Sequence, residues 1–437
     1  MNDFRQHAQN LIDFISSSPT AFHATATIRQ MLQANGFCQL FEGESWDLQQ
    51  GTGYFVVRDQ GALIAFTLGQ EERLEDGFRM LGAHTDSPSL QLKPHPLHHK
   101  KSYCKLAVEL YGGALLATWF DRDLSIAGRV LVRSGEGEYQ KILLDFARPL
   151  LCIPSLAIHL DREANKNRSI NSQKELEPLL SQKINAGLPD FNTILKKQIE
   201  REYPAISVEE ILSFDLFCYD QQKPSLLGLE EEFMVTSRLD NQLSCHAGAR
   251  AIIDAGFAKN TMLLCFNHEE NGSVSTSGGD SSFVNTVIER IIAEPEKRHI
   301  ALARSFLISM DNAHATHPNY PEKSEENHNI DLNYGPVIKI NANQRYATSA
   351  ISAGIYKAIA REAGVPCQEF VMKSDMPCGS TIGPMISARL GVRTIDVGAA
   401  SFAMHSIREM TGVKDPYLLY RVAAHFLQSD IHHKIHE

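Results

Sequence analysis

The carboxy-terminal half of the chain alternates short apolar runs with longer segments of helical periodicity. The strand-like runs are EEFMVTSRLD at 231–240, TMLLCFN at 261–267, SFLISMD at 305–311, CQEFVM at 367–372 and VRTIDVG at 392–398. Residues 241–256 predict a helix that ends at Gly256, and a second helix over 280–295 has Asp280 as its N-cap and Pro295 as its stop. This order of strands and helices predicts a largely parallel sheet covered by helices.

The first 92 residues follow the same scheme. Phe4, Leu11, Ile12 and Ile15 share roughly one face of an expected N-terminal amphipathic helix. The expected strands are YFVVRD at 54–59, ALIAFTL at 62–68 and FRMLGAH at 78–84. Residues 1–92 and 233–437 are therefore predicted to form one α/β domain.

The stretch from 93 to 232 has a different pattern. Its strand-like segments are KLAVELYGGALLATWF at 105–120, AGRVLVRSG at 127–135 and YQKILLDF at 139–146. No regular helix is expected between these strands, and the polar residues 162–185 predict a surface loop. We interpret 93–232 as a β-rich domain inserted into the α/β domain, because 437 residues are too many for one small core.

Net charge and cysteine usage narrow the class of protein. The net charge of −10 argues against nucleic acid as the main partner, because phosphate binding needs a basic surface. No apolar run reaches the ~18 residues that span a bilayer, and Asp3, Arg5 and Asp13 interrupt any signal-peptide core. The eight cysteines form no CxxC pair, and Cys218 and Cys265 lie in apolar runs, which predicts buried free thiols. We therefore expect a cytoplasmic protein without nucleic-acid or membrane partners.

Acidic and histidine residues follow five of the predicted strands. The five segments are RMLGAHTDSP, FMVTSRLDNQLS, LLCFNHEENGS, FLISMDNAHATHP and GAASFAMHS. In an open α/β sheet, ligands bind outside the carboxyl ends of the strands. If these strands are neighbours, one cleft collects His84, Asp86, Asp240, Glu269, Glu270, Asp311 and His405.

This set contains carboxylates and imidazoles but no cysteine, which suits Zn²⁺ or Mn²⁺ in an open catalytic site. Two histidines and three carboxylates suffice for two metals if one carboxylate bridges, and two metals roughly 3.5–4 Å apart form a hydrolytic arrangement. Each residue alone also has an ordinary interpretation. Asp240 is a candidate helix N-cap, His405 a partly buried histidine, and residues 268–270 a solvated loop. Their joint occurrence at strand ends favours the metal site.

Seven ordered motifs resemble those of the aspartyl aminopeptidase family of co-catalytic dizinc exopeptidases. The motifs are GAHTDSP, SRLDNQLS, HEENGS, MDNAHATHPNY, QRYATSA, SDMPCGSTIGP and AMHSIREM. The match runs from about residue 10 to the carboxyl terminus. The resemblance implies a proteolytic α/β domain interrupted by a β-rich dimerisation domain. It also implies a homo-oligomer in which dimers assemble up to a dodecamer.

The resemblance assigns a role to each predicted metal ligand. His84 and Asp311 would hold one zinc ion, Glu270 and His405 would hold the other, and Asp240 would bridge the two. Two Zn²⁺ per subunit are expected, with Mn²⁺ or Co²⁺ as possible substitutes.

Two further acidic residues receive catalytic roles by the same resemblance. Glu269 would be the general base that deprotonates the attacking water. Asp86 would orient His84, in agreement with the carboxylate that usually supports a ligating histidine.

The resemblance also predicts the substrate site. Lys339, in GPVIKIN, would recognise the acidic side chain of the substrate. Without the resemblance, a lysine between two isoleucines on a strand would be interpreted as a solvent-facing residue. Gly379 and its neighbours would line the substrate cleft. His159 would reach the active site of the neighbouring subunit; its alternatives are a structural histidine or a three-histidine zinc site with His84 and His405.

The expected function is a cytoplasmic metallo-aminopeptidase that removes Asp or Glu from peptide N-termini. Two alternatives stay open at this point. The same cleft could serve a deacylase or carboxypeptidase on another amide, or the chain could be a weakly catalytic scaffold or cargo protein.

Overall fold

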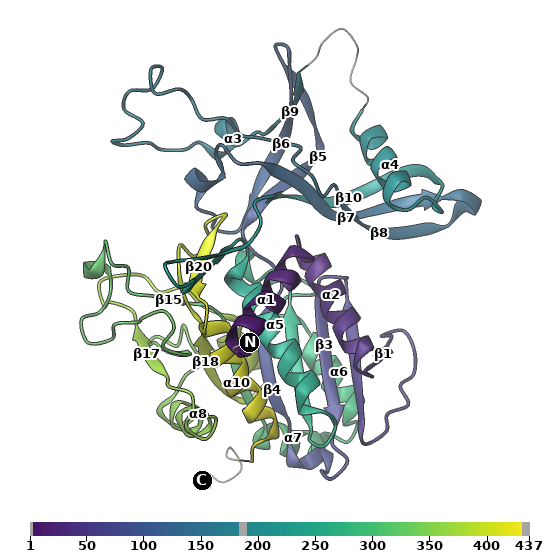
Figure 1. Cartoon of the computed structure of the whole chain (residues 1–437). Helices are drawn as coiled ribbons and strands as arrows, with labels where there is room; N and C mark the ends of the chain where they lie inside the picture. Colours follow the sequence, from purple (N-terminus) through teal and green to yellow (C-terminus); the bar gives the residue numbers. More distant parts are fainter. Residues whose placement is uncertain (1–2, 183–189, 431–437) are drawn as a thin grey trace. The chain divides into compact units, whose positions relative to one another are not determined.

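The computed structural model describes residues 3–182 and 190–430, which fold into two compact units (Figure 1). Unit 1 contains the described residues up to Asp86, Pro224–Met404 and those from Glu409 onward, and unit 2 contains Ser87–Lys223 and His405–Arg408. These boundaries differ from the predicted limits at 92/93 and 232/233. Strand β5 (Ser89–Lys100) pairs with a strand of unit 2, and β11 (Ser225–Leu227) pairs with a strand of unit 1. Each unit boundary therefore lies just before one of these strands.

A mixed sheet forms the centre of unit 1. Its strand order is β1 (Cys38–Leu40), β2 (Thr52–Arg58), β3 (Ala62–Leu68), β13 (Thr261–Phe266), β4 (Arg79–His84), β14 (Phe306–Met310), β18 (Arg393–Gly398), β16 (Val337–Ile340) and β17 (Gln368–Val371). The central strands β13, β4, β14 and β18 run parallel to one another, as predicted. Strand β3 instead pairs antiparallel with β2 and β13, because the link between β2 and β3 is too short for a crossover.

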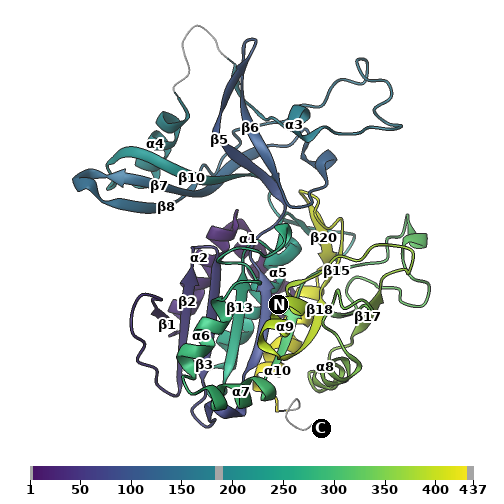
Figure 2. The same ribbon diagram turned by 180° about the vertical axis from the view of Figure 1, so that it is seen from behind.

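Helices cover both faces of this sheet (Figures 1 and 2). One face carries α1 (Asp3–Ser16), α2 (Ala21–Ala34), α5 (Leu239–Ala255), α8 (Ala350–Glu362) and α10 (Asp415–Gln428), and the other carries α6 (Phe283–Ile291), α7 (Pro295–Arg304) and α9 (Ile382–Leu390). In β13, Leu263 and Cys265 pack into the first layer, while Met262 and Leu264 pack into the second. Burial on both faces explains why the central strands are continuous apolar runs, and the α/β prediction is confirmed.

A small second sheet also belongs to unit 1. Its strand order is β11, β12 (Phe233–Thr236), β20 (Glu409–Gly412), β19 (Ala400–Phe402) and β15 (Ala313–His314). The run that precedes Asp240 therefore lies in this sheet and not beside the central strands. Short strands with turn-rich neighbours carry no signal that tells one sheet from another.

Unit 2 is built on an antiparallel sheet. Its strand order is β8 (Tyr139–Asp145), β7 (Leu124–Ser134), β10 (Val208–Asp220), β5, β6 (Tyr103–Tyr111) and β9 (Leu179–Gln182), and it also contains α3 (Ser172–Glu175) and α4 (Phe191–Glu202). No α-helix lies between the predicted strands of residues 105–146, as expected, but α4 later in this region was not predicted. In α4, Asp190 accepts the N–H of Thr193 at 3.0 Å as an N-cap, and Phe191, Leu195 and Ile199 are buried.

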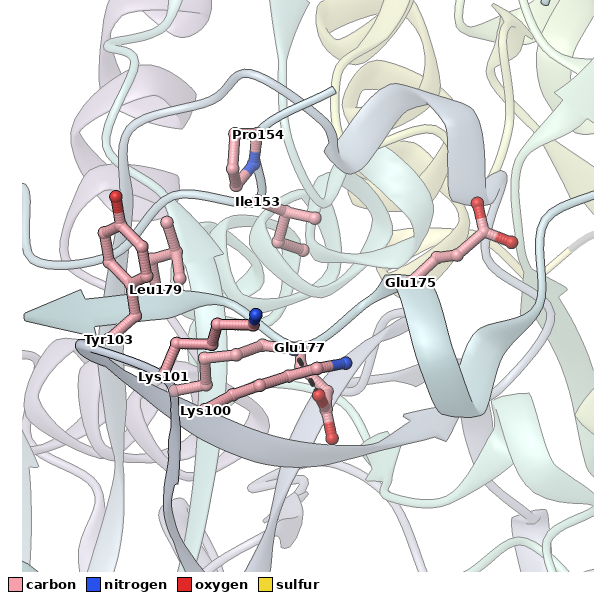
Figure 3. A pocket seen from close by; sticks show the side chains of 9 residues that line it. Lys100, Lys101, Tyr103, Ile153, Pro154, Glu175, Glu177 and Leu179 are labelled. Carbon is pink, nitrogen blue, oxygen red and sulfur yellow. Dashed lines mark hydrogen bonds and ion pairs between the residues drawn. The ribbon is translucent and has the colours of Figure 1, made fainter. Parts of the chain in front are cut away.

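Unit 2 has its own apolar core and one pocket of note. The core gathers Leu106, Ile126, Val130 and Leu216 with the apolar face of α4. The pocket has a volume of about 320 Å³ and is lined by Lys100, Lys101, Tyr103, Lys105, Ile153, Pro154, Glu175, Glu177 and Leu179 (Figure 3). None of the residues predicted for the catalytic site lines it.

Two details of the helix predictions change in the structure. Helix α5 does end before Gly256, but the helix predicted over 280–295 is shorter, since α6 covers only Phe283–Ile291 and a separate helix, α7, begins at Pro295. Asp280 accepts a hydrogen bond from Arg389 Nε at 2.6 Å instead of capping a helix, and the N-cap of α6 is Ser282. Pro295 begins α7, because the first turn of a helix tolerates a residue without an N–H.

Cysteine and membrane predictions can also be compared with the structure. The eight cysteines all lie within the described residues and are free thiols, and Cys218 and Cys265 are buried as predicted. Within residues 3–182 and 190–430, no helix has the length and apolar content needed to cross a bilayer.

Candidate metal centre

Three adjacent strands deliver acidic and histidine side chains to one edge of the main sheet. Strand β4 pairs in parallel with β13 on one side and with β14 on the other. His84 is the last residue of β4, Asp311 follows β14, and Glu269 and Glu270 follow β13 after two intervening residues. Because the carboxyl ends of parallel strands meet at one edge, these side chains converge.

Asp240 joins this cluster from the start of α5. Its backbone is not helical (φ −81°, ψ 107°), and its N–H donates to Glu409 Oε2 at 2.9 Å. The side-chain amide of Asn241 donates to Met310 O at 2.8 Å, which ties this turn to the end of β14. Asp240 is not the N-cap, since Arg238 occupies that position.

Sequence reasoning assigned no role to Glu409 or Asn241. Both are buried, with 2% and 0% of their surface exposed. Only their positions in two motifs could have indicated a role. Glu409 lies in AMHSIREM, four residues after His405, and Asn241 lies in SRLDNQLS, directly after Asp240.

The imidazole of His84 is surrounded by carboxylates. Its Nε2 lies 3.3 Å from Asp240 Oδ1 and 3.5 Å from Asp311 Oδ1, and its Nδ1 lies 3.4 Å from Asp86 Oδ1. Burial alone would lower the pKa of His84, but the three carboxylates outweigh it and raise this pKa well above its usual value. The ring is thus oriented by Asp86 on one side and faces two acidic residues on the other.

The two adjacent glutamates are positioned by a tight turn. His268 has left-handed backbone angles (φ 61°, ψ 23°) and introduces the short turn η4 (Glu269–Asn271). The N–H groups of Glu269 and Glu270 donate to the two carboxylate oxygens of Asp86 at 3.2 and 3.1 Å. Asp86 therefore contacts both the histidine and the glutamate turn.

Burial changes the acidity of both glutamates. It raises the pKa of Glu269 to about 7; nearby His84 counteracts this, whereas Asp311, Asp86 and Asp240 add to it. Burial and the charge of Asp240 also raise the pKa of Glu270 well above its usual value. A carboxylate with a pKa near neutrality is suited to accept and return a proton.

Lys339 lies beside the same cluster. Its Nζ donates to Asp311 Oδ2 at 3.1 Å, and the side chain is 3% exposed. The solvent-facing alternative therefore does not hold. The Tyr346 ring lies 5.4 Å from the ammonium, which completes a polar and aromatic surrounding for this cation.

The arrangement fits a divalent metal. His84, Asp240 and Asp311 each offer one ligand atom within 4.8 Å of the others, and so do His84, Glu269 and Glu270. Asp311 Oδ1 is buried and accepts no hydrogen bond from any described residue. Imidazole nitrogen with carboxylate oxygen is a zinc donor set, and a divalent cation would offset the repulsion among the buried carboxylates.

Three further predicted site residues come from other segments of the chain. His405 belongs to the His405–Arg408 segment of unit 2, where its Nδ1 lies 3.1 Å from Gly113 O. His159 is exposed in a loop of unit 2, and Gly379 is exposed in the loop between β17 and α9. Their roles stay predictions.

Comparisons with known proteins agree on one family. A profile of the family described as "Aminopeptidase I zinc metalloprotease (M18)" matches residues 14–427. The chain is 49% identical to a probable M18 family aminopeptidase 2 of Stutzerimonas stutzeri, covering 96% of this chain and 98% of that protein. It is 47% identical to the protein of the same name in Pseudomonas aeruginosa, with the same coverage of each chain.

Solved structures give the same result. The chain superposes with a TM-score of 0.95 on a chain of the cryo-EM structure of the Ape4 and Nbr1 complex, at 36% identity, covering 99% of this chain and 88% of that one. It superposes with a TM-score of 0.87 on the S. cerevisiae mApe1 dodecamer, at 27% identity, covering 99% of each chain.

Zinc binding is expected to stabilise the chain measurably. A ligand at ~100 times its dissociation constant adds about 2.7 kcal/mol to the free energy of unfolding, which corresponds to roughly 5 °C in melting temperature. Chelated protein should therefore melt higher after zinc is added, and Asp311→Asn should lose most of this gain. The matched control is the exposed Asp331→Asn, which should keep it. An equal gain in Asp311→Asn and in the parent protein would exclude Asp311 as a ligand.

Proposed function

This chain belongs to the M18 family and is a zinc metallo-aminopeptidase, and we propose that it preferentially removes Asp or Glu from peptide N-termini. The observation that carries the proposal is the buried Lys339 ammonium beside the carboxylate cluster. The relatives are named aminopeptidases, which favours this class over a deacylase, a carboxypeptidase or a scaffold protein. Free thiols throughout the chain support a reducing, cytoplasmic location.

Charge complementarity supports the acidic preference. The cluster already contains the carboxylates of Asp86, Asp240, Asp311, Glu269 and Glu270, so an acidic substrate would meet repulsion unless a cation were close. The buried ammonium of Lys339 is such a cation. A compact ammonium in a closed site favours a carboxylate over a neutral side chain.

Two zinc ions are proposed, with His84 and Asp311 holding one, Glu270 and His405 the other, and Asp240 bridging. Zinc in such a site supplies a Lewis acid that polarises the scissile carbonyl and makes water more acidic. Asp86 keeps the ligand ring of His84 and the turn of Glu269 and Glu270 in place through the contacts described above.

Glu269 moves the proton in this proposal. Its carboxylate accepts a proton from the attacking water as the water oxygen bonds to the first peptide carbonyl carbon. The carboxyl group then donates that proton to the nitrogen of the departing peptide as the C–N bond breaks. The carboxylate is thereby restored for the next cycle.

The neighbouring glutamates should respond differently to the same substitution. Glu269→Gln is expected to keep its zinc content and to lose ~10²–10⁴ in kcat, the usual contribution of a general base. Glu270→Gln is the matched control, and it should lose zinc because one ligand charge is gone. Zinc is measured by elemental analysis and kcat with an Asp-anilide. A fully active Glu269→Gln enzyme would remove Glu269 from the base role.

Replacement of Lys339 tests the acidic preference. Lys339→Met keeps the length of the side chain and removes its charge. The expected result is a loss of about 10- to 100-fold in kcat/KM for an Asp-anilide and little change for a Leu-anilide, since hydrogen bonds to charged groups contribute about 1.5–3 kcal/mol. Zinc content is measured alongside, because Lys339 also contacts Asp311. An equal loss of kcat/KM on both anilides at full zinc content would mean that Lys339 only holds Asp311 in place and does not recognise the substrate.

A homo-oligomer is the second part of the proposal. The similar S. cerevisiae mApe1 is a dodecamer, and we infer that this chain also assembles, with unit 2 as its dimerisation domain. His159, exposed in unit 2, would then reach the neighbouring active site. Gly379 and adjacent backbone groups would line the substrate cleft of the same subunit.

Mixed oligomers test whether His159 acts across subunits. His159→Ala and Glu269→Gln proteins are each expected to be impaired when assembled alone. Dissociated and reassembled together, they should regain activity, because some sites then combine an intact Glu269 with the partner's intact His159. Reassembled mixtures of Glu269→Gln with itself provide the baseline. No gain in the mixture above the weighted mean of the two variants would place His159 outside any neighbouring site.

A further inference from the structure

Asp396 is a buried carboxylate of β18 that the proposed reaction does not use. Its surface is fully buried. Strand β18 pairs with β14, and Asp396 lies opposite Ser309, two residues before Asp311. A buried charge is costly unless several groups compensate it, so its partners indicate what it does.

Two loops are fastened to this carboxylate. The N–H of Ala347 donates to Asp396 Oδ2 at 2.6 Å, and the hydroxyl of Thr381 donates to Oδ1 at 2.6 Å. Ala347 belongs to the loop between β16 and α8, and Thr381 ends the loop between β17 and α9. One side chain therefore holds two segments that are more than 30 residues apart in sequence.

Further contacts hold the two loops and β18 together at Asp396, a place that we call the Asp396 junction. The hydroxyl of Ser380 donates to Arg345 O at 3.2 Å, which connects the two loops directly. The N–H of Asp396 donates to the hydroxyl of Thr348 at 3.0 Å. The first turn of α9 lies on the carboxylate so closely that a Cβ on Gly383 would approach its oxygens to 2.4 and 2.5 Å. Only glycine permits this approach, and the helix N-terminus favours the negative charge.

The Asp396 junction lies next to Lys339, the residue proposed to recognise the acidic substrate side chain. Strand β16 pairs antiparallel with β18, Val337 with Gly398 and Ile338 with Val397, and the charge of Lys339, the next residue of β16, acts on the carboxylate of Asp396. Tyr346, the residue before Ala347, is buried and holds its ring 5.4 Å from Lys339 Nζ. Tyr346 and Cys378 of the second loop pack in the same apolar cluster. The first loop thus contacts the surroundings of Lys339 directly, and the second packs against it through Tyr346.

We propose that Asp396 is a positioning residue that fixes the wall of the acidic-side-chain pocket around Lys339. It acts through Ala347 and Thr381, which set the position of Tyr346 and of the loop that carries Cys378 and Gly379. The inference rests on the proposed preference for N-terminal Asp or Glu. It adds that this preference depends on a carboxylate that never contacts the substrate.

The test uses Asp396→Asn in the full-length, zinc-loaded protein. The amide keeps the shape of the side chain, and it loses the charge and one of the two acceptor oxygens. The expected result is a rise of about tenfold in KM for an Asp-anilide, the order that one charge-assisted hydrogen bond supplies. The kcat, the zinc content and kcat/KM for a Leu-anilide should change by less than about threefold. Hydrogen exchange over residues 341–349 should accelerate, because the Ala347 N–H loses its acceptor.

Two companion variants make the result specific. Thr381→Val removes the other donor at nearly constant volume, and it should shift the same KM in the same direction if Asp396→Asn fails to fold. Asp415→Asn is the matched control: Asp415 is also buried and accepts the backbone N–H groups of Asn333 and Gly335 at 2.7 and 3.3 Å. It should lower the melting temperature without changing the preference for Asp over Leu.

The outcomes separate this inference from the function on which it rests. A parent enzyme without preference for the Asp-anilide would contradict the proposed function itself. A parent enzyme with that preference, unchanged in both Asp396→Asn and Thr381→Val, would overturn the positioning role alone. Equal losses on both anilides in Asp396→Asn, matched by Asp415→Asn, would also overturn it and would assign Asp396 to general stability.

Discussion

Repulsion among closely spaced, buried and half-buried carboxylates is the constraint on which this structure depends. Asp86, Asp240, Asp311, Glu269 and Glu270 share one edge of the main sheet with the imidazole of His84 and the ammonium of Lys339. Burial and mutual repulsion raise the pKa values of both glutamates. A fold that keeps these charges together needs cations to offset them, and divalent zinc held as proposed would do so while supplying the chemistry of an aminopeptidase.

The surrounding architecture holds the cluster against that repulsion. Parallel pairing of β13, β4 and β14 brings three strand ends to one edge. Asn241 and Glu409 hold the turn that carries Asp240, and Asp86 accepts the N–H groups of both glutamates. A buried carboxylate also holds backbone and side-chain donors in place away from the metal centre, where Asp396 binds two loops beside Lys339. Rigid placement of charge therefore connects the core of the sheet to the proposed substrate pocket.

Much of this arrangement could be predicted from the sequence, since apolar runs that end in charged residues identify β4, β13 and β14 and the residues after them. The helix α4 was missed because its apolar positions are sparse, and Pro295 was misread because a proline can start a helix as well as stop one. The burial of Lys339 could not be predicted from IKI, because alternation on a strand does not reveal that both faces are covered. Glu409 and Asn241 act through backbone contacts between distant segments, which leave no periodic signal.

The most direct test of the central claim is a zinc titration of chelated protein followed by initial rates on an Asp-anilide. The account predicts a negligible rate without metal and a rise that levels off at two zinc ions per chain. Full activity in the presence of chelator, or a plateau at one zinc ion per chain, would contradict it.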